Sequence, residues 1–499
     1  MIKKKYLFSL ISLLFIILLI IGSLSIVRGE KDELSKITNL IPNNVKTFLK
    51  KTLFVHAELK TKEKEIENQK KIIDIKNSTI KILDYKLNNY FNDYIKSDYF
   101  TKTNIEFVKI EKDKIYNNKS FNLKVEKFVS SYLFNGKHQG ARATGYLDQY
   151  KEKIFLTTGD GMFLFFDLKQ LNNEKLNLKK IKSNIKEVIF TDIYNNANDD
   201  QYSTTIIGKS IKDLKIIDEE LFISFHNEVK RDCFNTSILK AKINFNFLNF
   251  ERFFVPSECV NKENEYGEFN WFHSGGRITD YKDNLILFTI GEYRFRDLAQ
   301  NTESIFGKII SIDKNSKDWK IISMGHRNPQ GIYYDIKEDY IVSTEHGPNG
   351  GDEININLNP DSGNIKNFGW PISSYGYHYD NKFNQKSKAP LHKSHTKYGF
   401  EEPIKYYTPS IAISEVVKIP DQFSPGLRNS FFVAAMGSIL EEGDLSIHLL
   451  DFKDKFSKIE SHETIQLGER VRDIVYIKGI NKFICYLETT GTIMILSNN

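Results

Sequence analysis

Residues 340–358 read YIVSTEHGPNGGDEININL, which is a run of β-branched and aromatic residues, a Gly- and Pro-rich turn and a second apolar run. This pattern predicts a β-hairpin. The same pattern recurs in five further stretches, at 153–168, 221–244, 285–313, 430–452 and 483–496. Six such units in one chain indicate an all-β fold, and we predict a six-bladed β-propeller over residues 126–499.

The turns near these hairpins are rich in hydrogen-bonding side chains. Three polar clusters lie within 325–371: His326-Arg327-Asn328, Glu345-His346-Gly347-Pro348 and Asp352-Glu353. A loop that only reverses the chain does not need so many polar groups, whereas a loop that holds a charged ligand does. The clusters therefore predict a binding site. The polar stretch 374–399 that follows is predicted to be a loop on one face of the propeller.

Arginine is used selectively in this chain. There are 59 Lys but only 11 Arg, so Arg is expected where the planar guanidinium group itself is required. Six arginines fall inside candidate motifs, namely Arg277, Arg294, Arg296, Arg327, Arg470 and Arg472. Four arginines precede a Thr or Ser of a following strand by 12 to 17 residues, namely Arg142, Arg277, Arg327 and Arg472. We expect these four on one face near the central channel, with structural ion pairs as the alternative role.

The N-terminus carries a candidate membrane segment. Lys3-Lys4-Lys5 precede an uncharged apolar run from Tyr6 to Val27. This run is long enough to cross a bilayer as a helix, and the lysines favour a cytoplasmic N-terminus. A cleaved signal peptide is the alternative, although the run is long and lacks a small-x-small cleavage site. We predict that residues 1–30 are a membrane anchor and that the rest lies in the periplasm or outside the cell.

Residues 31–125 are predicted to form a stalk with a helix at about 57–97, because that stretch contains no Gly or Pro. Apolar residues recur there every seven positions, at Leu59, Ile66, Ile73, Ile80 and Leu87. The second apolar column of a coiled coil is mostly polar. A dimer through this helix and a solvated single helix therefore remain alternatives.

Charge is concentrated at the N-terminal end of the chain. Residues 1–100 carry 18 Lys and Arg against 11 Asp and Glu, whereas the remainder carries 52 against 53. The large domain is therefore close to neutral, which argues against a nucleic-acid-binding protein. The basic excess suits a stalk close to anionic lipid.

The three cysteines suggest one bridge and one buried thiol. Cys233 and Cys259 flank a predicted hairpin and could form a disulfide after export. Cys485 lies in the apolar run FICYL and is expected to be buried and unreactive.

Several motifs occur in a fixed order along the C-terminal half of the chain: HSGGR (273–277), Ala299-Gln300 with Gly307-Lys308, GHRNPQG (325–331), EHGP with GGDEIN (345–355), NFGWP (367–371) and RVRD (470–473). In these motifs the chain resembles the soluble pyrroloquinoline quinone (PQQ)-dependent aldose sugar dehydrogenases, the glucose/sorbosone dehydrogenase family. The resemblance is dense over 271–371, patchy towards the C-terminus and absent before about residue 125.

The resemblance implies an enzyme that oxidises an aldose sugar at its anomeric carbon by hydride transfer to bound PQQ. It assigns the general base to His273, a role that suits an imidazole. It further implies that calcium polarises the quinone, since a hard cation accepts main-chain carbonyl ligands.

The resemblance also implies the residues that hold these groups. The quinone oxygens would be contacted by Arg327 and Asn328, and the cofactor carboxylates by Arg470 and Arg472. Main-chain carbonyls of Gly347 and Pro348 would bind calcium. Three neighbours have lesser expected roles, with Asp352 and Glu353 ordering the loop or its metal and Trp370 packing.

Two positions depart from the family pattern. A cofactor-contacting lysine follows the strand of the family's fifth unit, but this chain has Met436-Gly437-Ser438 there. The family's Asp after Thr/Ser-Ile-Gly is Glu292 here, and the first-unit motif is hard to find around 138–146. These departures keep open an alternative, a non-enzymatic propeller that binds a glycan or a protein partner.

Overall fold

The structure, a computed structural model, describes residues 43–96, 103–117, 122–131, 144–159, 161–189, 211–263, 268–379, 388–427, 429–453, 456 and 458–498. The predicted anchor (1–30) and Arg142 lie outside these ranges. By contacts the chain divides into two compact units, Met1–Asp74 and Ile75–Asn499.

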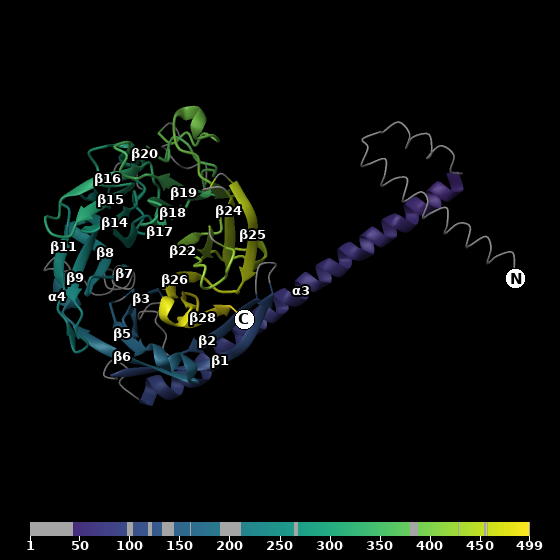
Figure 1. Ribbon diagram of the computed structural model, residues 1–499, viewed down its shortest axis with the longest axis horizontal. Helices are drawn as coiled ribbons and strands as arrows, with labels where there is room; N and C mark the ends of the chain where they lie inside the picture. Colours follow the sequence, from purple (N-terminus) through teal and green to yellow (C-terminus); the bar gives the residue numbers. More distant parts are fainter. Residues whose placement is uncertain are drawn as a thin grey trace. The chain divides into compact units, whose positions relative to one another are not determined.

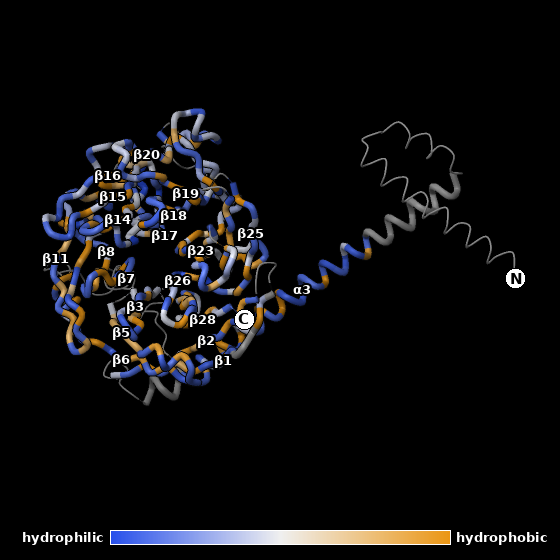
Figure 2. Tube along the Cα trace, viewed as in Figure 1, coloured by the Kyte–Doolittle hydropathy of each residue, from blue (hydrophilic) through white to orange (hydrophobic). Residues whose placement is uncertain are grey.

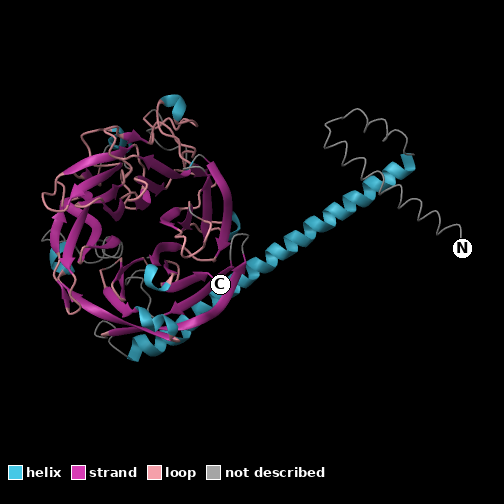
Figure 3. Ribbon diagram, in the orientation of Figure 1, coloured by secondary structure: helices cyan, strands magenta, loops and turns pink. Residues whose placement is uncertain are grey.

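The described strands of the second unit form six antiparallel blades around a central channel (Figures 1 and 3). The first strand of each blade is innermost and contacts the first strands of both neighbouring blades. Blade 1 contains β3 (Gly145–Tyr150), β4 (Lys153–Thr158), β5 (Phe163–Asp167) and β6 (Lys175–Ser183). Blade 2 contains β7 (Ile211–Ile217), β8 (Glu220–Lys230), β9 (Cys233–Lys242) and β11 (Glu251–Phe254). Blade 3 contains β13 (Gly275–Tyr281), β14 (Leu285–Ile290), β15 (Lys308–Asp313) and β16 (Trp319–Met324).

The remaining blades follow the same order from the channel outwards. Blade 4 contains β17 (Pro329–Asp335), β18 (Tyr340–Glu345), β19 (Asp352–Leu358) and β21 (Lys405–Tyr407). Blade 5 contains β22 (Ile413–Lys418), β23 (Ser430–Ala435), β24 (Ser446–Lys453) and β25 (Lys458–Gln466). Blade 6 contains β26 (Val471–Ile477), β27 (Lys482–Leu487), β28 (Thr492–Asn498) and β2 (Asn122–Val129).

Short elements complete the fold. Three two-residue strands extend blade edges, namely β10 (Phe247–Leu248), β12 (Val260–Asn261) and β20 (Lys366–Asn367). The described short helices are η1 (Leu168–Asn172), α4 (Ile185–Ile189), η3 (Arg296–Gln300), η4 (Thr396–Tyr398), η5 (Leu440–Glu442) and η7 (Lys478–Ile480). The stretch 374–399, predicted to be a loop, lies between β20 and β21 and carries η4.

Each predicted hairpin corresponds to the second and third strands of one blade. These strands are rich in buried apolar residues because both faces of each blade are covered by the neighbouring blades. Six hydrophobic clusters accordingly lie one between each pair of adjacent blades, and a seventh, smaller cluster contains Ala299, Trp370, Ala389 and Leu391. Figure 2 shows hydrophobic segments (orange) along the strands of the ring. Outer strands alternate instead, as in β25, because only one of their faces is covered.

The ring closes through strands from the N-terminal side of the chain. β2 pairs with β28 as the outermost strand of blade 6, and β1 (Asn104–Asn117) pairs with both β2 and β6. The first and last blades thereby share one continuous sheet. We predicted that the propeller begins at residue 126 and assigned this segment to the stalk. The structure differs because β1 and β2 find their partners in distant blades.

The helix α3 (Asn43–Lys96) is longer at its N-terminal end than the predicted 57–97. Its buried residues, Ile75, Ser78, Ile82 and Lys86, follow a helical spacing along one face. The heptad residues point elsewhere, and each of them is more than half exposed: Leu59, Ile66, Ile73, Ile80 and Leu87. No helix within the described ranges combines the length and apolar character that a bilayer span requires.

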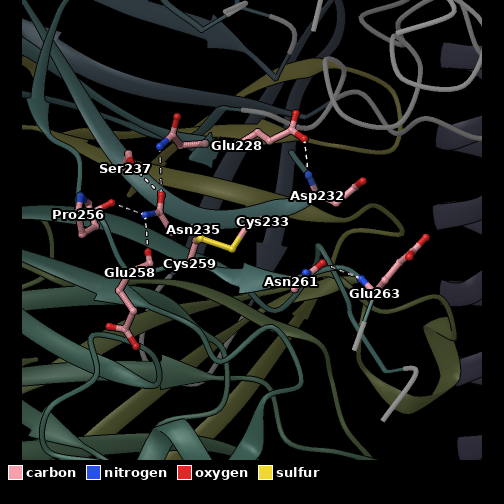
Figure 4. The surroundings of a disulfide bond; sticks show 11 residues. Glu228, Asp232, Cys233, Asn235, Ser237, Pro256, Glu258, Cys259, Asn261 and Glu263 are labelled. Atoms are coloured by element: carbon pink, nitrogen blue, oxygen red, sulfur yellow. Dashed lines mark hydrogen bonds between the residues drawn. A yellow bond between two sulfur atoms is a disulfide. The ribbon is translucent and has the colours of Figure 1, made fainter. Parts of the chain in front are cut away.

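Cys233 and Cys259 form a disulfide, as the sequence suggested. It links β9 to the segment before β12 (Figure 4). The side-chain amide of Asn235 donates to the main-chain oxygens of Pro256 and Glu258, both at 2.8 Å. Cys485 is buried in β27, as predicted, and burial raises the pKa of its thiol.

Candidate active site

One guanidinium group, that of Arg277 in β13, binds three buried carboxyl groups at the channel. Its Nη1 lies 3.0 Å from Asp213 Oδ1 and 2.8 Å from Asp473 Oδ1. It also lies 2.9 Å from Glu415 Oε2. Burial raises the pKa of Asp213 to about 6 and that of Glu415 to about 8, although Arg277 opposes both shifts.

The same guanidinium group contacts the remaining innermost strands. Arg277 Nε donates to the main-chain oxygen of Gln330 at 2.7 Å, and Nη2 donates to that of Arg472 at 2.8 Å. The ring of Tyr146 lies 5.1 Å from its Cζ. These partners lie on β17, β26 and β3, and the acidic partners lie on β7, β22 and β26. Arg277 therefore touches the first strand of each of the other five blades. Arg277 thus lies near the central channel, as predicted. Its contacts are structural ion pairs, which was the alternative role considered for these arginines.

His273 lies in a narrow pocket just before β13. The pocket is lined by His273, Glu292, Arg294, Arg296, Arg327, Pro348, Trp370, His378 and Tyr379. The imidazole Nδ1 is 2.8 Å from Glu292 Oε1, and Nε2 is 3.2 Å from Arg327 Nη2. The turn that carries His273 packs closely against Gly291, which follows β14. Only glycine fits there, because a Cβ on Gly291 would lie 2.1 Å from the main-chain oxygen of His273.

The electrostatic environment keeps His273 neutral. Burial lowers its pKa well below the ordinary value, and Arg327 and Arg294 lower it further. Burial raises the pKa of Glu292 to about 7, against the opposing effect of Arg327. When Glu292 is ionised, it accepts a hydrogen bond from Nδ1–H of His273, and the lone pair of Nε2 accepts one from Arg327 Nη2 at 3.2 Å.

Three arginines give the pocket an excess of positive charge. Arg296 Nη1 is paired with Glu268 Oε2 at 2.5 Å. Arg294 has no acidic partner within 4.0 Å among the described residues, and burial followed by the charge of Arg327 lowers its pKa. A cation without a counterion in a partly buried pocket favours an anionic ligand.

Arg327 and Asn328 lie between β16 and β17 and reach into the same region. Arg327 is fixed through its main-chain nitrogen, which donates to Glu345 Oε2 at 2.6 Å. Its Nη1 donates to the main-chain oxygen of His346 at 2.8 Å. Asn328 Oδ1 accepts from the main-chain nitrogen of Gly275, two residues after His273, at 3.1 Å.

Arg470 and Arg472 both bind a carboxylate of the protein itself. Arg472 donates through Nε and Nη2 to Glu488 Oε2 at 3.1 and 2.7 Å, and Arg470 Nη2 lies 3.6 Å from the same oxygen. Burial would raise the pKa of Glu488, but the two arginines lower it to about 2. Arg472 Nη1 also donates to Gln330 Oε1 at 3.3 Å. Gln330 in turn donates to Asn328 Oδ1 at 3.0 Å, so hydrogen bonds join this cluster to the His273 region.

Gly347 and Pro348 form a tight turn beside the pocket, and Pro348 lines it. Gly347 is required because a Cβ there would lie 2.1 Å from the main-chain oxygen of Gly351. Its main-chain nitrogen donates to Asp352 Oδ1 at 3.0 Å. Among the described residues, no group of three or more His, Cys, Asp or Glu side chains is arranged to hold a metal ion. A cation at this turn would therefore depend on main-chain oxygens and on the ligand.

The three neighbouring residues have distinct contacts. Asp352 orders the loop, since its Oδ2 also accepts from the main-chain nitrogen of Ile413 at 3.0 Å. Glu353 lies 3.4 Å from His395, which places it in a buried ion pair. Trp370, expected to pack, is buried and also lies under Arg327, with 5.3 Å between its ring and the guanidinium carbon.

Sequence reasoning gave Glu292 and Glu488 no role in the site and placed Glu345 there only as a member of a polar cluster. Glu292, Glu345 and Glu488 each occupy the end of the second strand of a blade, or lie one or two residues beyond it. Each one bonds a residue near the start of the first strand of its own blade. A Glu after the second apolar run of a unit is a repeated signal that could have found them.

The profile of the family Glucose / Sorbosone dehydrogenase matches residues 218–494, more than half of the chain. The chain belongs to the glucose/sorbosone dehydrogenase family. It is 28% identical over 215 residues to the aldose sugar dehydrogenase YliI of Escherichia coli (strain K12), covering 40% of this chain and 54% of that protein. It is 29% identical over 144 residues to the quinoprotein glucose dehydrogenase B of Acinetobacter calcoaceticus, covering 22% and 29%. The chain thus spans about half the length of the first of these curated relatives.

Solved structures of this family share the fold. A glucose dehydrogenase superposes with a TM-score of 0.55 at 18% identity, covering 72% of this chain and 96% of that chain. The soluble aldose sugar dehydrogenase of Escherichia coli in its apo form gives 0.53 at 19% identity, with the same coverages. At these identities the likeness supports the propeller fold alone.

Proposed function

We propose that this chain oxidises aldose sugars at the anomeric carbon by hydride transfer to bound PQQ, with His273 as the general base. The neutral, buried imidazole of His273 carries the proposal. Its Nδ1 is held by Glu292, and its Nε2 faces an arginine-rich pocket. A sugar hydroxyl against Nε2 would lose its proton to His273 as the hydride leaves. The names of the relatives, an aldose sugar dehydrogenase and a quinoprotein glucose dehydrogenase, support this substrate and cofactor class.

The residues present fit the cofactor. When bound, PQQ supplies an o-quinone that takes up the hydride, together with three carboxylates that need cationic partners. Arg294, which has no acidic partner among the described residues, and Arg327 offer such contacts in the pocket. Main-chain oxygens of Gly347 and Pro348 would hold calcium, a hard cation that polarises a quinone oxygen.

The lysine that the family carries after the fifth unit is absent here, but a cation does lie at that position. Arg470 Nη1 donates to the main-chain oxygen of Gly437 at 3.0 Å. Gly437 itself has no room for a side chain, since a Cβ would lie 1.8 Å from Asp444 Oδ2. This contact favours the enzyme over the alternative, a propeller that binds a glycan or protein without catalysis.

The experiment titrates the purified full-length chain with PQQ and calcium and follows dye reduction with a panel of aldoses. We expect micromolar or tighter PQQ binding and turnover of at least one aldose. His273→Ala should lower kcat by roughly 10²–10⁴-fold and leave PQQ binding intact, because the base acts only in the chemical step. His462→Ala, on the exposed side of β25, is the matched control. Failure to bind PQQ at micromolar concentration would instead support the binding module.

The membrane anchor and the dimer also belong to this proposal. The apolar run Tyr6–Val27 supports an anchor that keeps the propeller in the periplasm or outside the cell.

The exposed heptad residues of α3 support a dimer with a second copy of the chain. Ile73→Lys combined with Ile80→Lys should convert a dimer to a monomer in sedimentation, and a monomeric parent protein would refute the dimer.

A further inference from the structure

The loop 467–470, which carries Arg470, is held against blade 5. The main-chain nitrogens of Leu467 and Gly468 both donate to the oxygen of Leu445 at 3.0 Å. Arg470 itself reaches Gly437 O, as described above. The position of the Arg470 side chain therefore depends on the position of this loop.

The other side of the loop rests on α3. Gly468 has a left-handed backbone, with φ of +74°, and a Cβ there would lie 2.3 Å from Ile75 Cγ2 and 3.5 Å from Thr79 Oγ1. Ile75 is buried. The helix thus lies so close to the loop that only glycine fits between them.

Buried charges reinforce this contact. Glu469, fully buried, accepts from Thr490 Oγ1 at 2.5 Å and lies 3.5 Å from Lys127 Nζ. Lys86 of α3 donates to the main-chain oxygen of Ser130 at 2.8 Å. Burial lowers the pKa of Lys86 to about 7, and the charge of Glu469 opposes that shift. The charge of Lys86 therefore couples the helix to Glu469, the residue after Gly468.

A second contact reaches the segment that supplies Gly437. Lys76 Nζ of α3 lies 3.4 Å from Glu441 Oε1, in η5. Gln466 Nε2 donates to the main-chain oxygen of Leu440 at 3.1 Å, which joins η5 to the end of β25. The same turns of helix thereby contact both segments that meet at Arg470.

We propose that residues 75–86 of α3 brace the loop 467–470 and position Arg470, so that this helix takes part in cofactor binding. The effect on PQQ rests on the proposed function, whereas the brace itself does not. A displacement of about 1 Å is enough to weaken an oriented guanidinium contact, so a loosened helix would lower affinity without touching the ligand. Ile75 and Gly468 are in this sense positioning residues.

The test uses the full-length chain and the substitution Gly468→Ala. The added methyl group collides with Ile75, and we expect the Kd for PQQ to rise roughly 10-fold, the scale of one lost contact to a charged group. Gly426→Ala is the matched control, because Gly426 has a φ of +98° and a Cβ there would meet no atom within 4 Å. It carries the same backbone strain and should bind PQQ like the parent.

Two further variants separate positioning from a general loss of stability. Ile75→Ala combined with Gly468→Ala removes the collision and should recover part of the lost affinity. In an Arg470→Met background, Gly468→Ala should produce no additional weakening. Full weakening in that background, or equal Kd values for Gly468→Ala and Gly426→Ala, would overturn the proposal.

Hydrogen exchange provides a readout that does not require PQQ. Ile75→Ala alone should accelerate exchange of the amides in 437–442 and 467–471 at least severalfold, whereas amides of β14 should be unchanged. Unchanged exchange in both segments would refute the brace even if PQQ binds. A parent protein that binds no PQQ would refute the proposed function and leave the exchange result to decide the brace.

Discussion

A single residue, Glu292, determines whether Nε2 of His273 carries a proton. Glu292 as a carboxylate accepts the Nδ1 proton, and Nε2 then carries a lone pair. Glu292 as a carboxylic acid donates to Nδ1, and Nε2 then carries the proton and is no longer a base. The ionisation of Glu292, with a pKa raised by burial to about 7, therefore controls the base.

We predict that kcat/KM rises with pH through about 7, because the fraction of ionised Glu292 rises there. Glu292→Gln should lower kcat/KM by roughly 10²-fold and remove this pH dependence. A steady-state pH–rate profile checks both points. Glu303→Gln, at an exposed position, is the control. A parent profile that is flat through pH 7 would contradict the assignment.

Arg277 is the residue on which the centre of the molecule most depends. We predict that Arg277→Met lowers the free energy of unfolding by about 3–5 kcal/mol, because buried carboxyl groups lose their shared cation. The loss should be larger at pH 8 than at pH 5.5. Removing the cation raises the native pKa values of Asp213 and Glu415 further, so the native state of the variant binds still more protons than its unfolded state and its stability falls more steeply as pH rises.

Urea unfolding at the two pH values measures this effect. Arg231→Met is the control, since the Arg231 side chain is 86% exposed and lies 3.9 Å from Asp232. An exposed pair of this kind contributes little. Similar losses for the two variants would show that Arg277 is not the central tie.

Among the elements, blade 2 has an additional covalent constraint. Its disulfide closes a loop of 26 residues at the outer part of the blade. In the sequence, that segment precedes the turn that carries His273.

We predict that Cys233→Ser combined with Cys259→Ser lowers the free energy of unfolding by about 3 kcal/mol, the entropic cost of opening a loop of this length. Cys485→Ala, which keeps both bridging cysteines, should retain the bridge. Thiol titration of the denatured protein should find one free thiol without reductant and three with it. Equal counts under both conditions would exclude the bridge.

For the whole molecule, closure of the ring is the critical step. β2 covers the edge of β28, and an uncovered edge of this kind would expose unpaired main-chain groups. The two strands are about 370 residues apart in the sequence, so this pairing forms only when all six blades are present.

We predict that a chain beginning at residue 103 folds cooperatively, whereas a chain beginning at residue 131 does not, because only the first contains β1 and β2. Circular dichroism with thermal unfolding and size-exclusion chromatography distinguish the two outcomes. Cooperative unfolding of the shorter chain at the same temperature would show that β2 is dispensable.

The sequence alone determined the number of blades and the positions of their central hairpins. A strand buried on both faces is mostly apolar, and a run such as LILFTI records that requirement locally. The motifs also located His273, Arg327 and Asn328, because a tight turn that presents polar groups needs its glycines close by in the chain. The strands and turns named here are recognisable because the residues that define them are neighbours in the sequence.

Only the tertiary structure decided what each arginine binds. Arg277 and Arg472 both lie near the start of the innermost strand of a blade, yet Arg277 binds Asp213 and Asp473, and Arg472 binds Glu488. The partner Asp473 is 196 residues away from Arg277, and no local pattern records that separation. The ring closure by β2 and the contact of α3 with Gly468 were missed for the same reason: each joins segments far apart in the sequence, and burial between them exists only in the folded chain.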